Sequence, residues 1–362
     1  MSRAFIIAAR RSAVMPAGGA FARLLPHDLA VSVMQACLRD AGIAPDQVDE
    51  VILSNALGAG GNPARVAALA AGLPERVAGL SIDRQCAGGL DAVILAGALV
   101  NAGAAHVVLA GGAESYSRRP LRLRTDPDGG PPVAYDAPPF TPWPNRDPMM
   151  HVAAADLAQR LGISRATQDA YAVASHARAM ASQQPEIVPI TGLQRDGFTR
   201  AMTPALAARA KVIAGTITAA NAAVSADGAA FCLVVSERIA KQARRALHIK
   251  AGATLGANPQ EPGLAPLGAI ARVLSPRMMP RLIPDQCEIM EAYAVQAIAC
   301  IQGAGLDPAT VNIGGGALAR GHPVGASGAV LIARLFADIE RGHGLAAIAA
   351  AGGIGSALLI EA

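Results

Sequence analysis

One order of segments occurs twice in this chain, once in each half. In the first copy, the Gly-rich turn 86–89 precedes an apolar helical stretch over 90–102 and a strand at 106–110 that ends in Gly111-Gly112. The second copy comprises the turn 322–325, a helix over 326–340, a strand over 345–350 and the pair Gly352-Gly353. Alternating helices and strands are typical of a layered α/β fold. The repetition predicts that the chain consists of two duplicated halves.

The segments before the first copy follow the same alternation. Hydrophobic periodicity predicts strands at 4–8 and 50–54 and helices at 28–41 and 64–71, with Gly42 capping the first helix. The chain has 362 residues, of which 52% are hydrophobic, so two or three domains are expected and disorder is excluded for most of it. Because 3% of the residues are aromatic and 38 are Gly, we expect closely packed layers rather than a base-stacking surface.

Proline-dense sequence separates the two halves between residues 117 and 148. Proline at this density disfavours regular elements, so we expect an inserted loop region here. Amphipathic helices are predicted to follow at 151–161 and, with Ser164 as N-cap, at 166–182. The region is interpreted either as a linker with a helical excursion or as a lid over a ligand site.

The distribution of charge restricts the binding partners that we expect, and the cysteines restrict the cellular compartment. The net charge of +4 is spread along the chain without a basic stripe, which argues against nucleic-acid binding. The five cysteines contain no CxxC pair, so we expect no disulfide framework, no metal site and a reducing cytoplasm. The N-terminal apolar run is too short for a signal peptide, and no stretch has the length needed to cross a membrane.

Cys86 and His322 are the residues of these turns that could carry chemistry. Cys86 stands at an expected helix start, where backbone N–H groups and the helix dipole favour a thiolate. A buried structural thiol is the alternative, which we accept for Cys37, Cys232 and Cys300. His322 is held extended by the following Pro in a run of glycines that lacks the Lys and spacing of a phosphate-binding loop. Together the two suggest a nucleophile and a base for thioester or acyl chemistry.

Five motifs in order along the chain resemble the thiolase family. They are 85–90 (Gln-Cys-Ala-Gly-Gly-Leu), 110–115 (Ala-Gly-Gly-Ala-Glu-Ser), 215–221 (Gly-Thr-Ile-Thr-Ala-Ala-Asn), 291–293 (Glu-Ala-Tyr) and 321–323 (Gly-His-Pro). The resemblance implies a five-layered α-β-α-β-α fold made of two similar halves with an inserted loop domain. It predicts an N-terminal half over 1–117 and 211–247, a loop domain over 118–210 and a C-terminal half over 248–362. It also implies acyl-CoA as substrate, with coenzyme A entering only as part of it, and a homodimer, with a tetramer possible.

The resemblance also assigns roles to individual residues. It implies that Cys86 takes the acyl group, that His322 activates it, and that the backbone N–H groups of Cys86 and Ala351 form an oxyanion hole. Contacts to substrate or coenzyme A are implied for Met150, His151, Ser225, Ala292, Tyr293 and Gly325.

Two catalytic positions of the family are replaced in this chain. The family's second cysteine, which moves the proton at the α-carbon of the second acyl-CoA, aligns with Ala349, and the Asn of its Asn-Glu-Ala-Phe motif aligns with Met290. We considered Cys287, His343 and His151 as substitute proton carriers and favour His151, which follows the Met of the implied acyl pocket.

These residues are compatible with three functions. The first is a thiolase-like acyltransferase on acyl-CoA or 3-oxoacyl-CoA, whose ordinary thiolysis or Claisen condensation is expected to be impaired. The second is a catalytically weak or inactive thiolase homologue that binds acyl-CoA or a partner subunit. The third is a hydrolase in which water resolves acyl-Cys86.

Overall fold

The computed structural model describes residues 3–58, 60–275 and 282–362. Its main sheet has the strand order β13-β14-β15-β12-β1-β11-β5-β3-β4. Strands and helices of the first half are β1 (Ala4–Ser12), α1 (Pro26–Ala41), β3 (Glu50–Ser54), α2 (Pro63–Ala70), β4 (Leu80–Ile82), α3 (Gly88–Asn101), β5 (Val107–Glu114) and β11 (Ala226–Ser236). Those of the second half are β12 (Leu247–Gly256), α8 (Pro266–Leu274), β13 (Gln286–Ile289), α9 (Ala294–Ala304), α10 (Ala317–Arg320), α11 (Ser327–Asp338), β14 (His343–Ala350) and β15 (Ile354–Glu361).

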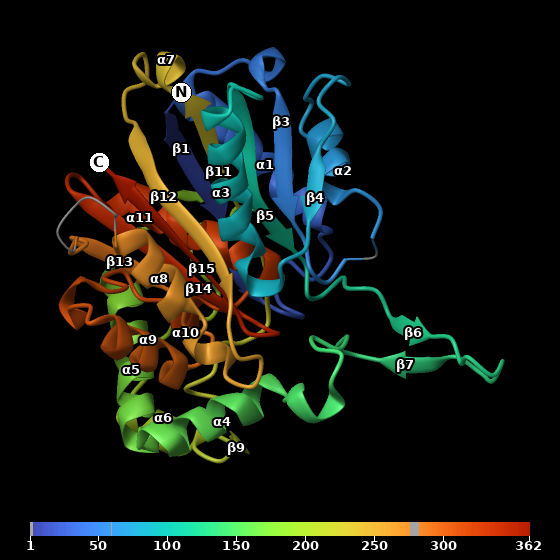
Figure 1. Cartoon of the computed structure of the whole chain (residues 1–362), viewed down its shortest axis with the longest axis vertical. Coiled ribbons are helices and arrows are strands. Elements are labelled where there is room, and N and C mark those ends of the chain that lie inside the picture. The colour runs from blue at the N-terminus through green and yellow to red at the C-terminus, as the bar shows by residue number, and fades with distance from the viewer. Residues whose placement is uncertain (1–2, 59, 276–281) are drawn as a thin grey trace.

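Three hydrophobic cores stack these elements into five layers. The two half-sheets meet at β1 and β12, which share the residue pairs Phe5–His248 and Ile6–Leu247. One core packs α1 and α2 on the outer face of the first half-sheet, and another packs α8 and α9 on the outer face of the second. Between the half-sheets, the third core contains α3 and α11 (Figure 1). The predicted α-β-α-β-α arrangement is therefore confirmed.

Side chains that alternate between the two faces of a strand explain how each half-sheet contributes to two hydrophobic cores. Phe231, Leu233 and Val235 of β11 enter the outer core, whereas Cys232 and Val234 enter the central one. Because neighbouring side chains of a strand point to opposite faces, both faces of such a strand must be apolar. This burial requires the Val, Ala and Leu runs that the sequence contains.

The repeated unit occurs as predicted, with one difference. A short 3₁₀ turn precedes α3 (residues 85–87) and α11 (residues 324–326), and β5 and β14 follow them. However, β5 continues through Gly111-Gly112 to Glu114 instead of ending at the Gly pair. A Cβ at Gly112 would lie 2.1 Å from the Gly325 carbonyl oxygen, so the glycine allows the turn after His322 to pack directly on β5.

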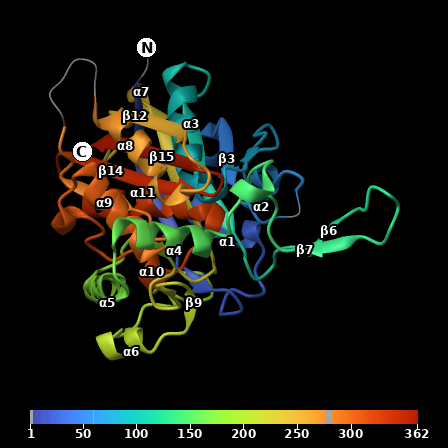
Figure 2. The same cartoon turned by 60° about the horizontal axis from the view of Figure 1, so that its bottom comes forward.

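The proline-dense region contains a hairpin, which corrects the expectation of a region without regular elements. The strands β6 (Arg122–Arg124) and β7 (Val133–Tyr135) pair antiparallel and project from the body of the molecule (Figures 1 and 2). Its prolines lie outside both strands, so the backbone N–H groups of the strands remain available for pairing.

The elements between the hairpin and β11 are mostly short. They are α4 (Met150–Leu161), α5 (Arg165–Ala181), β8 (Ile187–Val188), α6 (Pro204–Ala208), β9 (Val212–Ala214) and β10 (Ile217–Thr218). The predicted caps are confirmed, because the Ser164 side chain accepts a hydrogen bond from Thr167 N and Gly42 ends α1 with φ of +64°. The short strand β2 (Met15–Pro16) and helix α7 (Glu237–Ala240) complete the elements. Among the described residues, no helix combines the length and hydropathy required to cross a membrane.

Candidate active site

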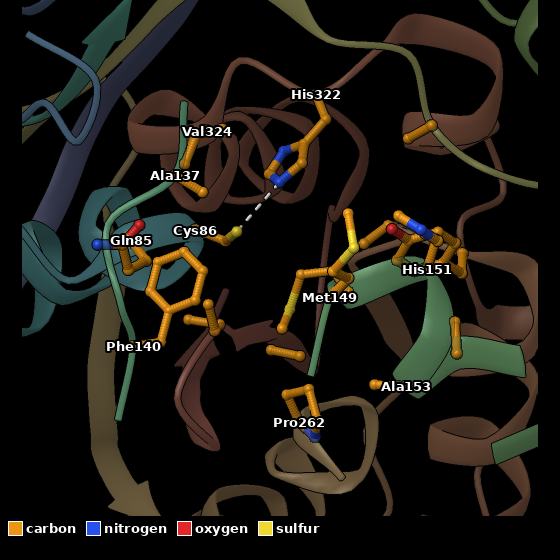
Figure 3. A pocket seen from close by; sticks show the side chains of 18 of the residues that line it. Gln85, Cys86, Ala137, Phe140, Met149, His151, Ala153, Pro262, His322 and Val324 are labelled. Carbon is orange, nitrogen blue, oxygen red and sulfur yellow. Dashed lines mark hydrogen bonds between the residues drawn. The ribbon is translucent and has the colours of Figure 1, made fainter. Parts of the chain in front are cut away.

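Cys86 and His322 meet where the turns before α3 and α11 come together. Cys86 lies in the turn 85–87, His322 lies just before the turn 324–326, and Cys86 Sγ is 3.1 Å from His322 Nε2 (Figure 3). Gln85 adopts φ of +50°, an uncommon backbone conformation for a residue other than Gly. The two repeats thus contribute one reactive side chain each, and 236 residues separate them in sequence.

Hydrogen bonds around His322 determine which ring nitrogen carries the proton. His322 Nδ1 lies 2.6 Å from Ser327 Oγ, and the Ser327 hydroxyl donates its proton to the Pro323 carbonyl oxygen at 3.1 Å. Ser327 must therefore accept from Nδ1–H, since a hydroxyl has a single proton to donate. This leaves the lone pair of Nε2 directed at the Cys86 thiol, as a general base requires.

Burial keeps both members of the pair uncharged in the resting site. Burial raises the pKa of the Cys86 thiol to about 12, although the backbone N–H groups of Cys86 and Ala351 hydrogen-bond the sulfur and act in the opposite direction. Burial also lowers the pKa of His322 to about 4. The backbone N–H groups lower the pKa of the Cys86 thiol, as expected for a helix start, but desolvation raises it by more. Proton transfer from thiol to imidazole must accompany attack on a substrate.

A mainly apolar cavity of about 370 Å³ opens beside the pair. Figure 3 shows Gln85 and Phe140 on one side of Cys86 and Met149 and His151 on the other. Of the residues singled out from the sequence, those that line the cavity are Cys86, His322, Met150, His151, Ser225, Ala292, Tyr293, Ala349 and Ala351. The proline-dense region contributes Arg122 and Phe140, and Tyr116 and Met149 flank it; the sequence did not single out any of these four residues.

Other residues singled out from the sequence lie away from the cavity. Gly325 is not among its lining residues, and its N–H donates to Glu114 Oε2 at 3.0 Å. Met290 is 1% exposed in the central core. Cys287 is fully buried in β13, and His343 begins β14 with Nε2 3.5 Å from Glu361 Oε1. Of the three substitutes considered, His151 alone lines the cavity.

Glu114 fixes two walls of the site and was not singled out from the sequence. Its carboxylate accepts hydrogen bonds from Asn55 Nδ2 (2.7 Å), Ala56 N (2.9 Å), Leu57 N (3.3 Å) and Gly325 N (3.0 Å). Burial raises the pKa of this carboxyl to about 7. A Glu at the end of an otherwise apolar strand was the available signal, but its partners are distant in sequence.

Glu291 has a similar anchoring role next to Ala292 and Tyr293, which line the cavity. Its carboxylate accepts from Ser175 Oγ (2.7 Å), Asn312 Nδ2 (2.7 Å), Tyr171 Oη (3.2 Å) and Leu318 N (3.2 Å). These bonds connect α5, the segment before α10 and the loop that leads to Tyr293. Within the described ranges, no cluster of three or more His, Cys, Asp or Glu residues is arranged to hold a metal ion.

Comparison with known proteins identifies the family. Residues 4–238 match the model of the thiolase N-terminal domain, and residues 244–362 match that of the thiolase C-terminal domain. The putative acetyl-CoA C-acetyltransferase YhfS of Bacillus subtilis is 40% identical over 99% of both chains. The acetyl-CoA acetyltransferase of Cupriavidus necator is 38% identical over 100% of both.

Solved structures agree with this match. The acetyl-CoA acetyltransferase of Bacillus anthracis has a TM-score of 0.90 at 33% identity and covers 100% of this chain and 99% of its own. The Acat5 thiolase of Ascaris suum, solved in complex with coenzyme A, has a TM-score of 0.92 at 28% identity, with 99% of both chains covered. Both halves of the chain, their motifs and their fold agree, and the protein belongs to the thiolase family.

Proposed function

We propose that this protein is an acyltransferase that acts on acyl-CoA or 3-oxoacyl-CoA thioesters through an acyl-Cys86 intermediate. The observation that carries the proposal is the 3.1 Å approach of Cys86 Sγ to His322 Nε2 beside an apolar cavity. The names of the relatives, acetyl-CoA acetyltransferase and putative acetyl-CoA C-acetyltransferase, and the coenzyme A complex of one neighbour support the same substrate class.

Acylation follows from the arrangement of the pair. His322 Nε2 takes the thiol proton as Cys86 Sγ attacks the thioester carbon, and the carbonyl electron pair moves onto oxygen. The backbone N–H groups of Cys86 and Ala351, which hydrogen-bond the sulfur at rest, are suited to hold this oxyanion. When the tetrahedral intermediate collapses, the coenzyme A thiolate leaves with the proton from His322. The products are acyl-Cys86 and free coenzyme A.

The carbon–carbon step is proposed to be impaired. The methyl group of Ala349 lines the cavity and cannot transfer a proton. A lost general acid or base costs roughly 10²- to 10⁴-fold in rate. Three routes avoid this loss: His151 as a substitute base, transfer of the acyl group to another acceptor, or a decarboxylative condensation, in which loss of CO₂ generates the carbanion.

Intact-protein mass spectrometry tests the proposal. The protein is incubated with a panel of acyl-CoA thioesters that includes acetyl-CoA, acetoacetyl-CoA and malonyl-CoA. We expect one acyl adduct, absent in Cys86→Ala and formed at least about 10²-fold more slowly in His322→Ala. An unmodified wild-type protein across the whole panel would refute an acyl-enzyme and favour the binding-only alternative. Thioester consumption without an acceptor would favour the hydrolase.

The assembly and location implied earlier belong to the same proposal. We propose a homodimer in the cytoplasm, and the five cysteines, all free thiols, are compatible with a reducing compartment. Light scattering on the purified protein distinguishes a dimer from a tetramer.

A further inference from the structure

Tyr293 is held at the cavity wall by its backbone neighbours. It pairs with Ala222 in an isolated bridge just before α9. Ala223 N donates to the Ala292 carbonyl oxygen at 2.9 Å, and Ala294 N donates to the Asn221 carbonyl oxygen at 2.9 Å. Since backbone bonds fix the chain on both sides of this residue, its side chain enters the cavity in a defined direction, toward the space that Cys86 also lines.

The phenol of Tyr293 is available to a ligand. Among the described residues, no group forms a hydrogen bond with its hydroxyl, whereas the Tyr171 hydroxyl donates to Glu291. Tyr293 and Cys86 line the same cavity, and burial raises the pKa of the Tyr293 phenol to about 12. The group therefore keeps its proton at neutral pH and can donate a hydrogen bond, but it does not act as a base.

Two other polar side chains that line the cavity, those of Gln296 and Ser225, are engaged or exposed. The Gln296 amide donates to Cys300 Sγ at 3.6 Å while its carbonyl oxygen accepts from Ala292 N at 3.2 Å. Ser225 is exposed. The backbone N–H groups of Cys86 and Ala351 point at the sulfur and therefore serve the oxygen of the Cys86-bound acyl group. A second thioester oxygen that gains negative charge lies outside the reach of this backbone pair, and the Tyr293 hydroxyl is a cavity-lining donor without a protein partner among the described residues.

We propose that Tyr293 is a catalytic residue whose hydroxyl hydrogen-bonds the thioester oxygen of a 3-oxoacyl-CoA substrate as that oxygen becomes an enolate. The inference rests on the proposed function through acyl-Cys86. It adds a side-chain donor to the backbone oxyanion hole and assigns it to the other carbonyl group of the substrate.

The step balances in the thiolytic direction. Cys86 Sγ bonds to the 3-oxo carbon while its proton passes to His322 Nε2. The bond between C2 and C3 breaks, and its electron pair is delocalised onto the thioester oxygen as an enolate, to which Tyr293 donates. The proton on His322 then reaches C2 through water or through His151, which takes the place of the missing second cysteine in this proposal. The products are acyl-Cys86 and a CoA thioester shortened by the transferred acyl group.

Tyr293→Phe separates this role from acylation. With acetyl-CoA, we expect the variant to form acetyl-Cys86 within about threefold of the wild-type rate, because that step uses backbone donors. With acetoacetyl-CoA and free coenzyme A, thiolysis should fall by about 10²-fold, the usual loss for one oxyanion donor. Tyr135→Phe, which removes a hydroxyl from β7, is the matched control and should retain both rates.

A second readout needs no turnover. Acetoacetyl-CoA bound to Cys86→Ala is titrated by the near-UV absorbance of its enolate, and the same titration is made on Cys86→Ala with Tyr293→Phe. Loss of the phenol hydroxyl should raise the pH at which bound acetoacetyl-CoA forms its enolate by about one to two units, the equivalent of one hydrogen bond to a charged oxygen.

Each outcome decides between the two proposals. Thiolysis within threefold of wild type together with an unshifted titration overturns the role of Tyr293. The role of Tyr293 is also overturned if Tyr293→Phe slows acetylation of Cys86 as much as it slows thiolysis. It is likewise overturned if Tyr116→Phe loses thiolysis and Tyr293→Phe does not. If the wild-type protein never acylates Cys86, the proposed function fails instead. The titration on the Cys86→Ala background then still decides whether Tyr293 stabilises an enolate.

Discussion

Ser327→Ala tests whether the orientation of His322 is essential for acylation of Cys86. The Ser327 hydroxyl accepts from His322 Nδ1 at 2.6 Å and donates to the Pro323 carbonyl oxygen at 3.1 Å. When His322 takes the thiol proton it becomes a cation, so the bond from Nδ1 to Ser327 becomes charge-assisted. A hydrogen bond to a charged group is worth about 1.5–3 kcal/mol. Its loss should slow acylation roughly 10- to 150-fold.

The assay follows acetyl-Cys86 by quenched-flow mass spectrometry at saturating acetyl-CoA, with unfolding by denaturant measured alongside. Ser236→Ala is the control, because the Ser236 hydroxyl is also buried and has no hydrogen-bond partner within the described part of the chain. Its acylation rate should stay within twofold of wild type. The reasoning is refuted if Ser327→Ala acylates at the rate of this control. It is also refuted if the loss of rate is matched by an equal loss of folding free energy in denaturant.

Two further predictions concern the buried carboxyl groups of Glu114 in β5 and Glu288 in β13, and the replaced positions. Burial raises the pKa values of Glu114 and Glu288 to about 7, so the folded state binds more protons than the unfolded state between about pH 4.5 and 7. The free energy of unfolding should therefore fall on the order of 3 kcal/mol per group from pH 5 to pH 8. In denaturant titrations, Glu288→Gln should reduce this dependence of stability on pH. A free energy of unfolding that rises with pH would contradict the assignment. Ala349→Cys combined with Met290→Asn should raise thiolysis of acetoacetyl-CoA at least about 10²-fold, and an unchanged spectrophotometric rate would show that these positions do not limit the reaction.

Local signals allowed most elements to be predicted from the sequence. Gly42 ends α1 and Ser164 caps α5 because a helix end needs a left-handed residue or a side-chain acceptor wherever the helix lies. The strand 50–54 was predicted with its observed bounds. The hairpin of β6 and β7 was missed because its three-residue strands carry no periodic pattern, and proline density was given more weight than the short gaps between prolines.

The geometry of the candidate site could be predicted from the sequence less completely than the helices and strands. Residue types and the family resemblance both suggested Cys86 and His322 as nucleophile and base, but spacing cannot reveal that they touch across 236 residues. The helix-start donors at Cys86 could be expected from the sequence, whereas the desolvation that outweighs them in the pKa of the thiol depends on tertiary packing. The anchoring role of Glu114 was missed for the same reason, since three of its four donors lie in residues 55–57.

The abundance of glycine follows from how the two repeats meet. Cys86 and His322 come from different halves, so their 3.1 Å contact depends on how closely the turn after His322 approaches β5 and α3. At Gly89 an added Cβ would lie 2.8 Å from the Gly325 carbonyl oxygen, and at Gly112 it would lie 2.1 Å from it. In both cases the obstacle is backbone, which cannot rotate away as a side chain can, so a methyl group at either position would push the second turn outward. Because Gly325 N also donates to Glu114, that displacement would pull on the loop that carries Ala56 at the cavity wall. The glycines therefore set the separation of the reacting atoms, and the apolar layers on either side hold it.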